Sequence, residues 1–136
     1  MPQIIRNQDR NHAHRVVVPE DHGVLTHTCF SILRLNRNES LTRRTEKYET
    51  VYVVLSGGCD IRVEEQWFWN VGRRKDIWSG KADSVYVPVG AETYVRARED
   101  GTEIAVAGGK YDRRLAPFRI APEDVVMVEV GSTETK

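Results

Sequence analysis

Two stretches decide the fold of this chain, Glu49-Thr-Val-Tyr-Val-Val-Leu-Ser-Gly57 and Tyr86-Val-Pro-Val-Gly90. The first is a run of β-branched and aromatic residues closed by glycine, which is typical of a strand that ends in a turn. In the second, a shorter strand-like segment ends at proline and glycine. These residues are typical of turns and weaken the interior of a strand. Both stretches therefore predict buried strands.

Further strand-like segments continue in both directions, separated by turns such as Gly57-Gly58 and Glu99-Asp-Gly101. No window shows sustained helical periodicity. One helical turn is expected at Ala121-Pro-Glu-Asp124, where proline needs no amide donor. The predicted strands are 15–18, 28–35, 48–55, 59–64, 67–70, 76–78, 84–87, 93–98, 102–107, 118–120 and 125–130. Many short strands at this spacing predict an all-β sandwich or barrel.

The length of 136 residues suits one hydrophobic core. We expect a flexible arm at 1–14, a single barrel at 15–130 and a carboxyl-terminal tail at 131–136. Twenty basic side chains balance twenty acidic ones, so no nucleic-acid partner is expected. The sequence has no apolar run of about 20 residues and no signal-peptide core at its start, so we expect no membrane association and a cytoplasmic location. Cys29 and Cys59 lie in strand-like runs and are expected to be buried thiols rather than a reactive pair.

These residues resemble the frame of a cupin, a double-stranded β-helix or jelly-roll barrel. More closely, the chain resembles the amino-terminal half of the 5-deoxyglucuronate isomerase family, bicupin enzymes of bacterial myo-inositol catabolism. The matching stretches are 30–35, 49–57, 72–74 with 77–80, 83–90, 120–125 and 128–131.

The resemblance implies an aldose–ketose isomerisation, in which a proton moves between neighbouring carbons through an enediol. A divalent metal would stabilise the oxyanion that develops. In the related hexuronate isomerase fold the metal ligands lie in the second barrel, which this chain does not contain. No cofactor is therefore expected in this chain, and a divalent metal is expected only in a second barrel.

The residues at the metal-ligand positions lead to the same expectation. A metal-binding cupin places His-x-His before a glutamate on one hairpin, and a further histidine just after the Pro-x-Gly turn. Here the hairpin reads Thr42-Arg-Arg-Thr-Glu-Lys-Tyr-Glu-Thr50, with Glu49 or Thr50 at the glutamate position and Thr93 at the last histidine. Alternation leaves open whether Glu49 or Thr50 faces inward, because both faces of this strand are apolar.

All four histidines, His12, His14, His22 and His27, precede residue 28. His12 and His14 have ligand-like spacing but lie in a polar arm with no clear third ligand. A solvated arm is the simpler interpretation, and a metal site shared with another subunit is the outlying alternative.

Arginine is the more informative charge. Arg43-Arg44 occupies the hairpin of the absent ligands, and any arginine turned inward could hold a sugar-acid carboxylate through two hydrogen bonds. The alternative is that each arginine pairs with an acid on the surface. No catalytic residue is assigned, and the candidate ligand-binding residues are Glu49, Arg34, Arg44, Arg62, Tyr52, Thr93 and Arg96.

The aromatic run Trp67-Phe-Trp69 places both tryptophans on one strand face. It could stack on a sugar, but a place in the core or in an interface is the simpler interpretation.

Two functional hypotheses follow. In the first, the chain is the amino-terminal barrel of a 5-deoxyglucuronate isomerase, as a fragment or separate subunit, and a second barrel supplies metal and catalysis. In the second, it is a self-sufficient metal-free cupin that binds a small sugar acid or organic acid, or serves as a dimerisation or regulatory module. Either way we expect a homo-oligomer or a second cupin barrel as partner. The coding sequence beyond Lys136 would separate the two.

Overall fold

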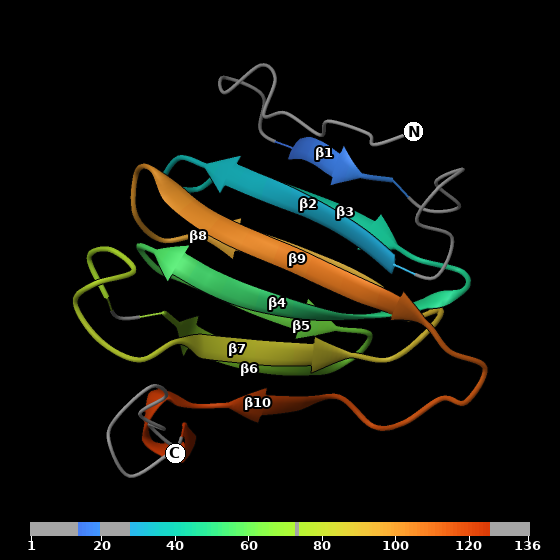
Figure 1. The fold of residues 1–136 in the computed structure, drawn as a ribbon. Helices are drawn as coiled ribbons and strands as arrows, with labels where there is room; N and C mark the ends of the chain where they lie inside the picture. The colour runs from blue at the N-terminus through green and yellow to red at the C-terminus, as the bar shows by residue number, and fades with distance from the viewer. Residues whose placement is uncertain (1–13, 20–27, 73, 126–136) are drawn as a thin grey trace, which may run out of the picture.

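The computed structural model describes residues 14–19, 28–72 and 74–125, which form two antiparallel sheets packed face to face (Figure 1). The larger sheet has the order β1-β2-β9-β4-β7-β10 and the smaller one β3-β8-β5-β6. The elements are β1 (His14–Val18), β2 (Thr28–Leu35), β3 (Ser40–Arg44), β4 (Tyr48–Ser56), β5 (Cys59–Val63), β6 (Gln66–Val71), β7 (Asp83–Val87), β8 (Glu92–Ala97), β9 (Thr102–Lys110), β10 (Phe118–Ile120) and the 3-10 turn η1 (Pro122–Asp124). This architecture confirms the predicted all-β class and the helical turn.

Figure 1 shows the larger sheet in front of the smaller one, with β1 and β10 at its two edges. Among the described residues, no helix has the length and apolar character needed to cross a lipid bilayer. The predicted arm at 1–14 lies almost wholly outside the described residues. The tail at 131–136 and most of the strand predicted at 125–130 also lie outside them.

Strand alternation builds the interior of the barrel. In β4 the side chains of Tyr48, Thr50, Tyr52 and Val54 are buried, whereas those between them are only half-buried. The same alternation buries every second residue of β2 from Cys29 to Leu35. Because successive side chains of a strand point to opposite faces, these buried sets line the space between the two sheets. The open question of β4 parity is thereby answered: Thr50 faces inward and Glu49 does not.

One layer of the interior is purely apolar. Leu33, Ile104 and Val54 are neighbours across β2, β9 and β4, and each has no exposed surface. Ile61 and Val95 face them from the smaller sheet as a register pair that is almost completely buried. Burial of these side chains removes apolar surface from water, which is the main stabilising contribution in a domain of this size.

A buried ion pair fixes the edge strand β10. Asp83 in β7 is 1% exposed, and its carboxylate accepts hydrogen bonds from Arg119 Nε at 2.9 Å and Arg119 Nη2 at 2.5 Å. It also accepts the backbone N–H of Gly72 at 2.8 Å, while Arg119 Nη1 donates to the carbonyl of Trp69 at 2.9 Å. The hydrogen bond from Arg119 to Asp83 raises the pKa of the guanidinium, which stays charged. The network therefore joins β6, β7 and β10.

The strand predicted at 76–78 is wrong. The Asp76 side chain accepts the backbone N–H of Trp78 at 2.9 Å, and the Ser79 hydroxyl donates to the carbonyl of Asp76 at 3.0 Å. Side chains of aspartate and serine commonly compete with sheet pairing in this way, and the result here is a turn. The turn leaves Trp78 87% exposed.

Strand β3 is the element that the sequence analysis missed. Its polar sequence, Ser-Leu-Thr-Arg-Arg, carries no strong strand signal, but it pairs along its whole length with β8. Pairing with β8 thus overrides the low intrinsic propensity of the segment.

Gly72 provides a first test of the fold. Its φ is +92°, and a Cβ added to it would lie 2.4 Å from Val54 Cγ1 and 2.9 Å from the carbonyl oxygen of Gly57. We expect Gly72→Ala to lower the free energy of unfolding by about 2–5 kcal/mol, from left-handed backbone strain and overpacking. Gly101→Ala is the matched control, because Gly101 also has a positive φ but open space around it. It should lower stability by only about 1 kcal/mol in urea unfolding, and equal effects of the two substitutions would contradict the packing.

Cys59 provides a second test. The thiol is fully buried, and burial, with a smaller effect of Asp60 and Asp83, raises its pKa from 9.0 to about 12. In the unfolded chain the thiol ionises near pH 9, whereas in the folded protein it remains protonated, so stability must fall as the pH rises above 9. Between about pH 8.5 and 10 this thiol should account for a loss of about 1 kcal/mol. Urea unfolding of Cys59→Ala should show a pH dependence that is shallower by that amount, and an unchanged slope would show that the thiol ionises in the folded state.

Candidate functional site

Two rows of inward-facing side chains meet near the polar end of the barrel. In the larger sheet, register places Ser31 of β2 and Tyr52 of β4 on either side of Val106 in β9. In the smaller sheet, Thr93 of β8 lies between Arg43 of β3 and Val63 of β5. The two rows thus bring one cation and three hydroxyl groups into the interior.

Hydrogen bonds across the interior connect the two rows. Arg43 Nη1 donates to Ser31 Oγ at 3.0 Å, and the side chains of Thr93 and Arg43 lie close enough to the Tyr52 hydroxyl to influence its pKa. Tyr52 is 3% exposed, Thr93 1% and Ser31 4%, while Arg43 is half-buried. We call these four residues, Ser31, Arg43, Tyr52 and Thr93, the interior cluster.

The electrostatics of the interior cluster are asymmetric. Burial raises the pKa of the Tyr52 phenol, an effect that Arg43 and the hydrogen bonds only partly offset, so the phenol is neutral at ordinary pH. Among the described residues, no carboxylate lies within ion-pair distance of Arg43. Within the part of the chain that the structure describes, the guanidinium therefore has a neutral hydroxyl partner and no opposing charge.

A second layer lies next to the cluster in the larger sheet. Cys29, Gly108 and Thr50 are register neighbours, and Thr50 is 3% exposed. Cys29 is near enough to Tyr52 to influence its titration. Both cysteines are buried, which confirms that interpretation of the sequence.

The structure brings together two of the seven candidate ligand-binding residues, Tyr52 and Thr93. Arg43, the less favoured member of the Arg43-Arg44 pair, is their charged partner. The sequence signal for it was the alternation Leu41-x-Arg43, because Leu41 packs against the core and residues two apart share a face. Ser31 was not predicted, since a lone serine in an apolar strand carries no distinctive signal.

The other five candidates lie on outer surfaces. Glu49 is on the outer face of β4, where it accepts a hydrogen bond from the Tyr86 hydroxyl. Arg34 is exposed and lies 3.9 Å from Glu103, and Arg96 donates to the side chain of Asn38 at 3.1 Å. Arg44 is the exposed residue next to Arg43 in β3. Arg62 lies on the outer face of the smaller sheet, over the Trp67 ring. None of the five candidates therefore contributes to the interior cluster.

The outer face of the smaller sheet carries the aromatic group. The rings of Trp67 and Trp69 stack with centroids 4.4 Å apart and an interplanar angle of 6°. The Arg62 guanidinium lies 5.6 Å from the Trp67 ring centroid and 5.3 Å from that of Tyr94, and its nearest carboxylate contact is Glu92 at 3.8 Å. Trp69 is 56% exposed, so this face is a surface aromatic ladder and not part of the core.

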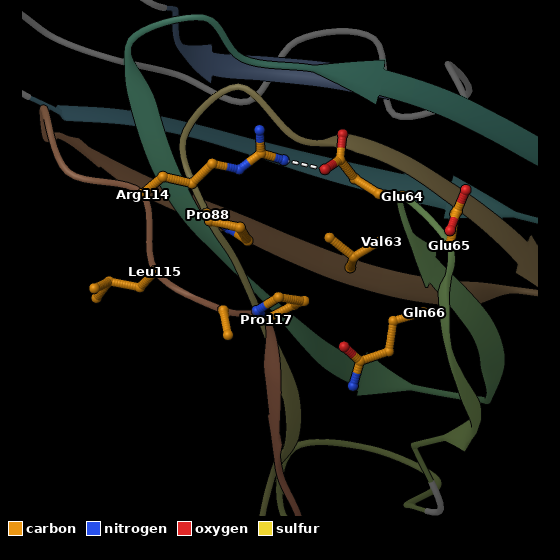
Figure 2. A pocket seen from close by; sticks show the side chains of 9 residues that line it. Val63, Glu64, Glu65, Gln66, Pro88, Arg114, Leu115 and Pro117 are labelled. Carbon is orange, nitrogen blue, oxygen red and sulfur yellow. Dashed lines mark hydrogen bonds and ion pairs between the residues drawn. The ribbon is translucent and has the colours of Figure 1, made fainter.

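An open pocket of about 460 Å³ lies outside the barrel, between the β5–β6 turn and the segment before β10. Figure 2 shows Arg114 reaching across Pro88 toward Glu64, with which it forms an ion pair, while Glu65 points away from that pair. Val63, Pro88 and Pro117 supply apolar walls. In this pocket the charge of Arg114 is already neutralised by Glu64. Arg43 has no such acid among the described residues, so the interior cluster is the stronger candidate site.

The described residues of the interior do not fit a metal ion. Arg43, Thr50 and Thr93 occupy the positions where a metal-binding cupin has imidazole and carboxylate ligands, and a guanidinium would repel a divalent cation. Within residues 14–19, 28–72 and 74–125, no group of three or more His, Cys, Asp or Glu side chains is placed to hold a metal. The weak metal alternative, His12 with His14, lies outside the side chains that the structure describes.

Comparison with known proteins identifies relatives of nearly the whole chain. The KduI/IolB family model matches residues 3–136. The 5-deoxy-glucuronate isomerase of Lacticaseibacillus casei is 29% identical over 127 residues, which are 91% of this chain and 46% of that enzyme. The crystal structure of an IolB-like protein from Salmonella typhimurium LT2 superposes with a TM-score of 0.74 and 26% identity, covering 78% of this chain and 40% of that one.

A more distant structure shares only the fold. A variant of Bacillus subtilis oxalate decarboxylase superposes with a TM-score of 0.57 and 17% identity, over 78% of this chain and 27% of the other. This chain therefore spans about half the length, or less, of these relatives. The barrel fold and the family match agree, and the chain belongs to the KduI/IolB family.

Proposed function

We propose that this chain is the non-catalytic barrel of a 5-deoxyglucuronate isomerase, and that a second cupin barrel carries out the isomerisation. The observation that carries the proposal is the chemistry of the interior, where Arg43, Thr50 and Thr93 take the positions at which a catalytic cupin has its metal ligands. The family match and the half-length coverage of the L. casei isomerase support a division of labour between two barrels.

The proposed reaction requires groups that this interior lacks. An aldose–ketose isomerisation needs a base to remove a carbon-bound proton and an electrophile to stabilise the oxyanion. The described interior cluster offers a neutral phenol, two aliphatic hydroxyls and a guanidinium. Arg43 could orient an acid or stabilise negative charge, but none of its described partners is a base at neutral pH. Proton transfer is therefore assigned to the second barrel, with its divalent metal, in the cytoplasmic pathway of inositol breakdown.

The outer face of the larger sheet is the surface that we propose for the partner barrel. Val51 and Val53 on β4 and Ile32 on β2 are half-buried there, and Phe118 is 48% exposed where it stacks on Tyr86. An apolar sheet face of this kind is typical of surfaces that are covered in an assembly. A second barrel in the same polypeptide, or a second copy of this chain, would cover this apolar face.

The second hypothesis, a self-sufficient metal-free cupin, is favoured by the same interior cluster. An unbalanced arginine among hydroxyl groups can bind a small acid without any partner barrel. In that case ligand binding would itself be the function.

Activity of the isolated chain tests the proposed function. Purified protein, shown to be folded by a cooperative thermal transition, should not convert 5-deoxyglucuronate measurably by proton NMR, with or without added Mn²⁺ or Zn²⁺. The full-length L. casei isomerase is the positive control in the same assay. Turnover by the isolated chain within about 100-fold of that control would overturn the proposal, because a barrier difference of under about 3 kcal/mol would indicate a working active site.

A further inference from the structure

The outer face of the larger sheet carries an apolar band that crosses five strands. Figure 1 looks onto this face, with β9 and β4 at its centre. Strand register sets two rows of side chains across it. The first row, from β2 to β10, is Phe30, Ala107, Val51, Tyr86 and Phe118. The second row is Ile32, Ala105, Val53, Ser84 and Ile120. Ser84 is the exception among apolar and aromatic side chains.

Charged side chains lie at the two margins of this band. Arg34 and Glu103 are register partners at one margin, and Glu49 lies beside Gly109 at the other. The face therefore has an apolar centre and a charged rim, which is the anatomy of a protein–protein interface. With its margins the face measures roughly 24 Å by 27 Å, or about 650 Å², which approaches the ~800 Å² per partner that a stable complex buries.

The order of the strands makes this face complementary to itself. The centre of the larger sheet lies between β9 and β4. A twofold axis along the strands through this centre would place β9 of one copy over β4 of another, and β2 over β7. Ala107 would then face Val51 of the second copy, and Ala105 would face Val53. Each small side chain of β9 thus meets a larger one of β4, which fills the centre of the contact at the density of a protein interior.

The same axis keeps like charges apart. Glu49 of one copy would lie over Gly109 of the other, and Arg34 near the start of β7, so no two like charges of the described face coincide. An axis across the strands would instead place each strand over itself, with Ala107 against Ala105 and a gap at the centre. Sheets packed face to face keep their strand directions within about 30° of each other, so the pairs nearest the axis align best.

We propose that a second copy of this chain covers the outer face of the larger sheet, in a dimer whose twofold axis runs along the strands between β9 and β4. The inference rests on the proposed function for the choice of surface, and it names which of the two possible occupants covers it. The two apolar bands form the core of the interface, and Arg34, Glu103 and Glu49 lie at its rim.

Sedimentation equilibrium of the isolated, tag-free chain tests the dimer. The wild-type chain should dimerise with a dissociation constant of about 10 µM or below. Ala107→Arg places a large charged side chain at the centre of the interface and leaves the barrel interior unchanged, because Ala107 is exposed on the outer face. It should weaken dimerisation by about 100-fold or more, since a charge buried without a partner is unfavourable.

Thr42→Arg is the matched control. It adds the same side chain at an exposed position of β3, on the outer face of the smaller sheet. The dissociation constant should stay within about twofold of the wild-type value, whereas a general effect of added charge would weaken both variants equally. Cooperative thermal unfolding of each variant establishes that it is folded.

Cysteine crosslinking tests the position of the axis. In Ala107→Cys, a short bis-maleimide should join the two copies, because residue 107 lies beside the proposed axis. In Phe118→Cys it should not, because the axis places β10 of the two copies at opposite edges of the dimer. An axis across the strands would bring the two copies of residue 118 together. The wild-type chain, in which Cys29 and Cys59 are buried, is the background control.

Three results would overturn the inference. A wild-type chain that stays monomeric up to about 200 µM would leave this face to a second barrel. A dimer that Ala107→Arg leaves intact would use another surface. Crosslinking through residue 118 and not through residue 107 would place the axis elsewhere. None of these results bears on the isomerase assay, in which the isolated chain should be inactive as monomer or dimer, so failure of the dimer and failure of the proposed function can be told apart.

Discussion

The alternation of β4 is the constraint on which the rest of this barrel depends. The strand lies between β9 and β7 in the larger sheet, so its register is fixed from both sides. A shift of one residue would move every buried side chain to the outer face. With the observed register, Val54 completes the apolar layer, Tyr52 enters the interior cluster, and Glu49 is excluded from it.

Two regions of different chemistry follow from this constraint. In one, the row of Leu33, Ile104 and Val54 packs as an apolar layer, beyond which the buried Thr102 hydroxyl bonds to the carbonyls of Gly58 and Glu99. In the other, Arg43 bonds across to Ser31 and connects the two sheets through a polar contact. The Asp83–Arg119 pair stabilises the edge of the larger sheet, where Asp83 is the register partner of Val54.

Much of this arrangement could be predicted from the sequence. The strong runs of β4 and β7 predicted the barrel, because β-branched residues bounded by glycine and proline allow few alternatives. Strand β3 was missed since its five residues include four polar ones, and only pairing with β8 makes them a strand. The segment 76–78 was predicted to be a strand because isoleucine and tryptophan are common in strands. Instead, hydrogen bonds from the side chains of Asp76 and Ser79 close a turn.

The candidate site was predictable only in part, because it depends on parity. Tyr52 and Thr93 could be chosen from their positions, but the choice of Arg43 over Arg44 required recognition of β3 as a strand, in which Leu41 and Arg43 share the inward face. The surface locations of Arg34, Arg62 and Arg96 follow from contacts with Glu103, Tyr94 and Asn38, which are distant in sequence. Such contacts cannot be read from local pattern. The functional roles of all these residues stay predictions.

The central claim is that an arginine and three hydroxyl groups, and not a metal, occupy the polar end of this barrel. Elemental analysis of the purified, tag-free protein, dialysed without chelator, tests that claim most directly. The account predicts less than about one tenth of an equivalent of zinc, manganese, iron or nickel per chain after removal of residues 1–14, because the interior cluster repels cations. A stoichiometric metal that survives removal of those residues would contradict it.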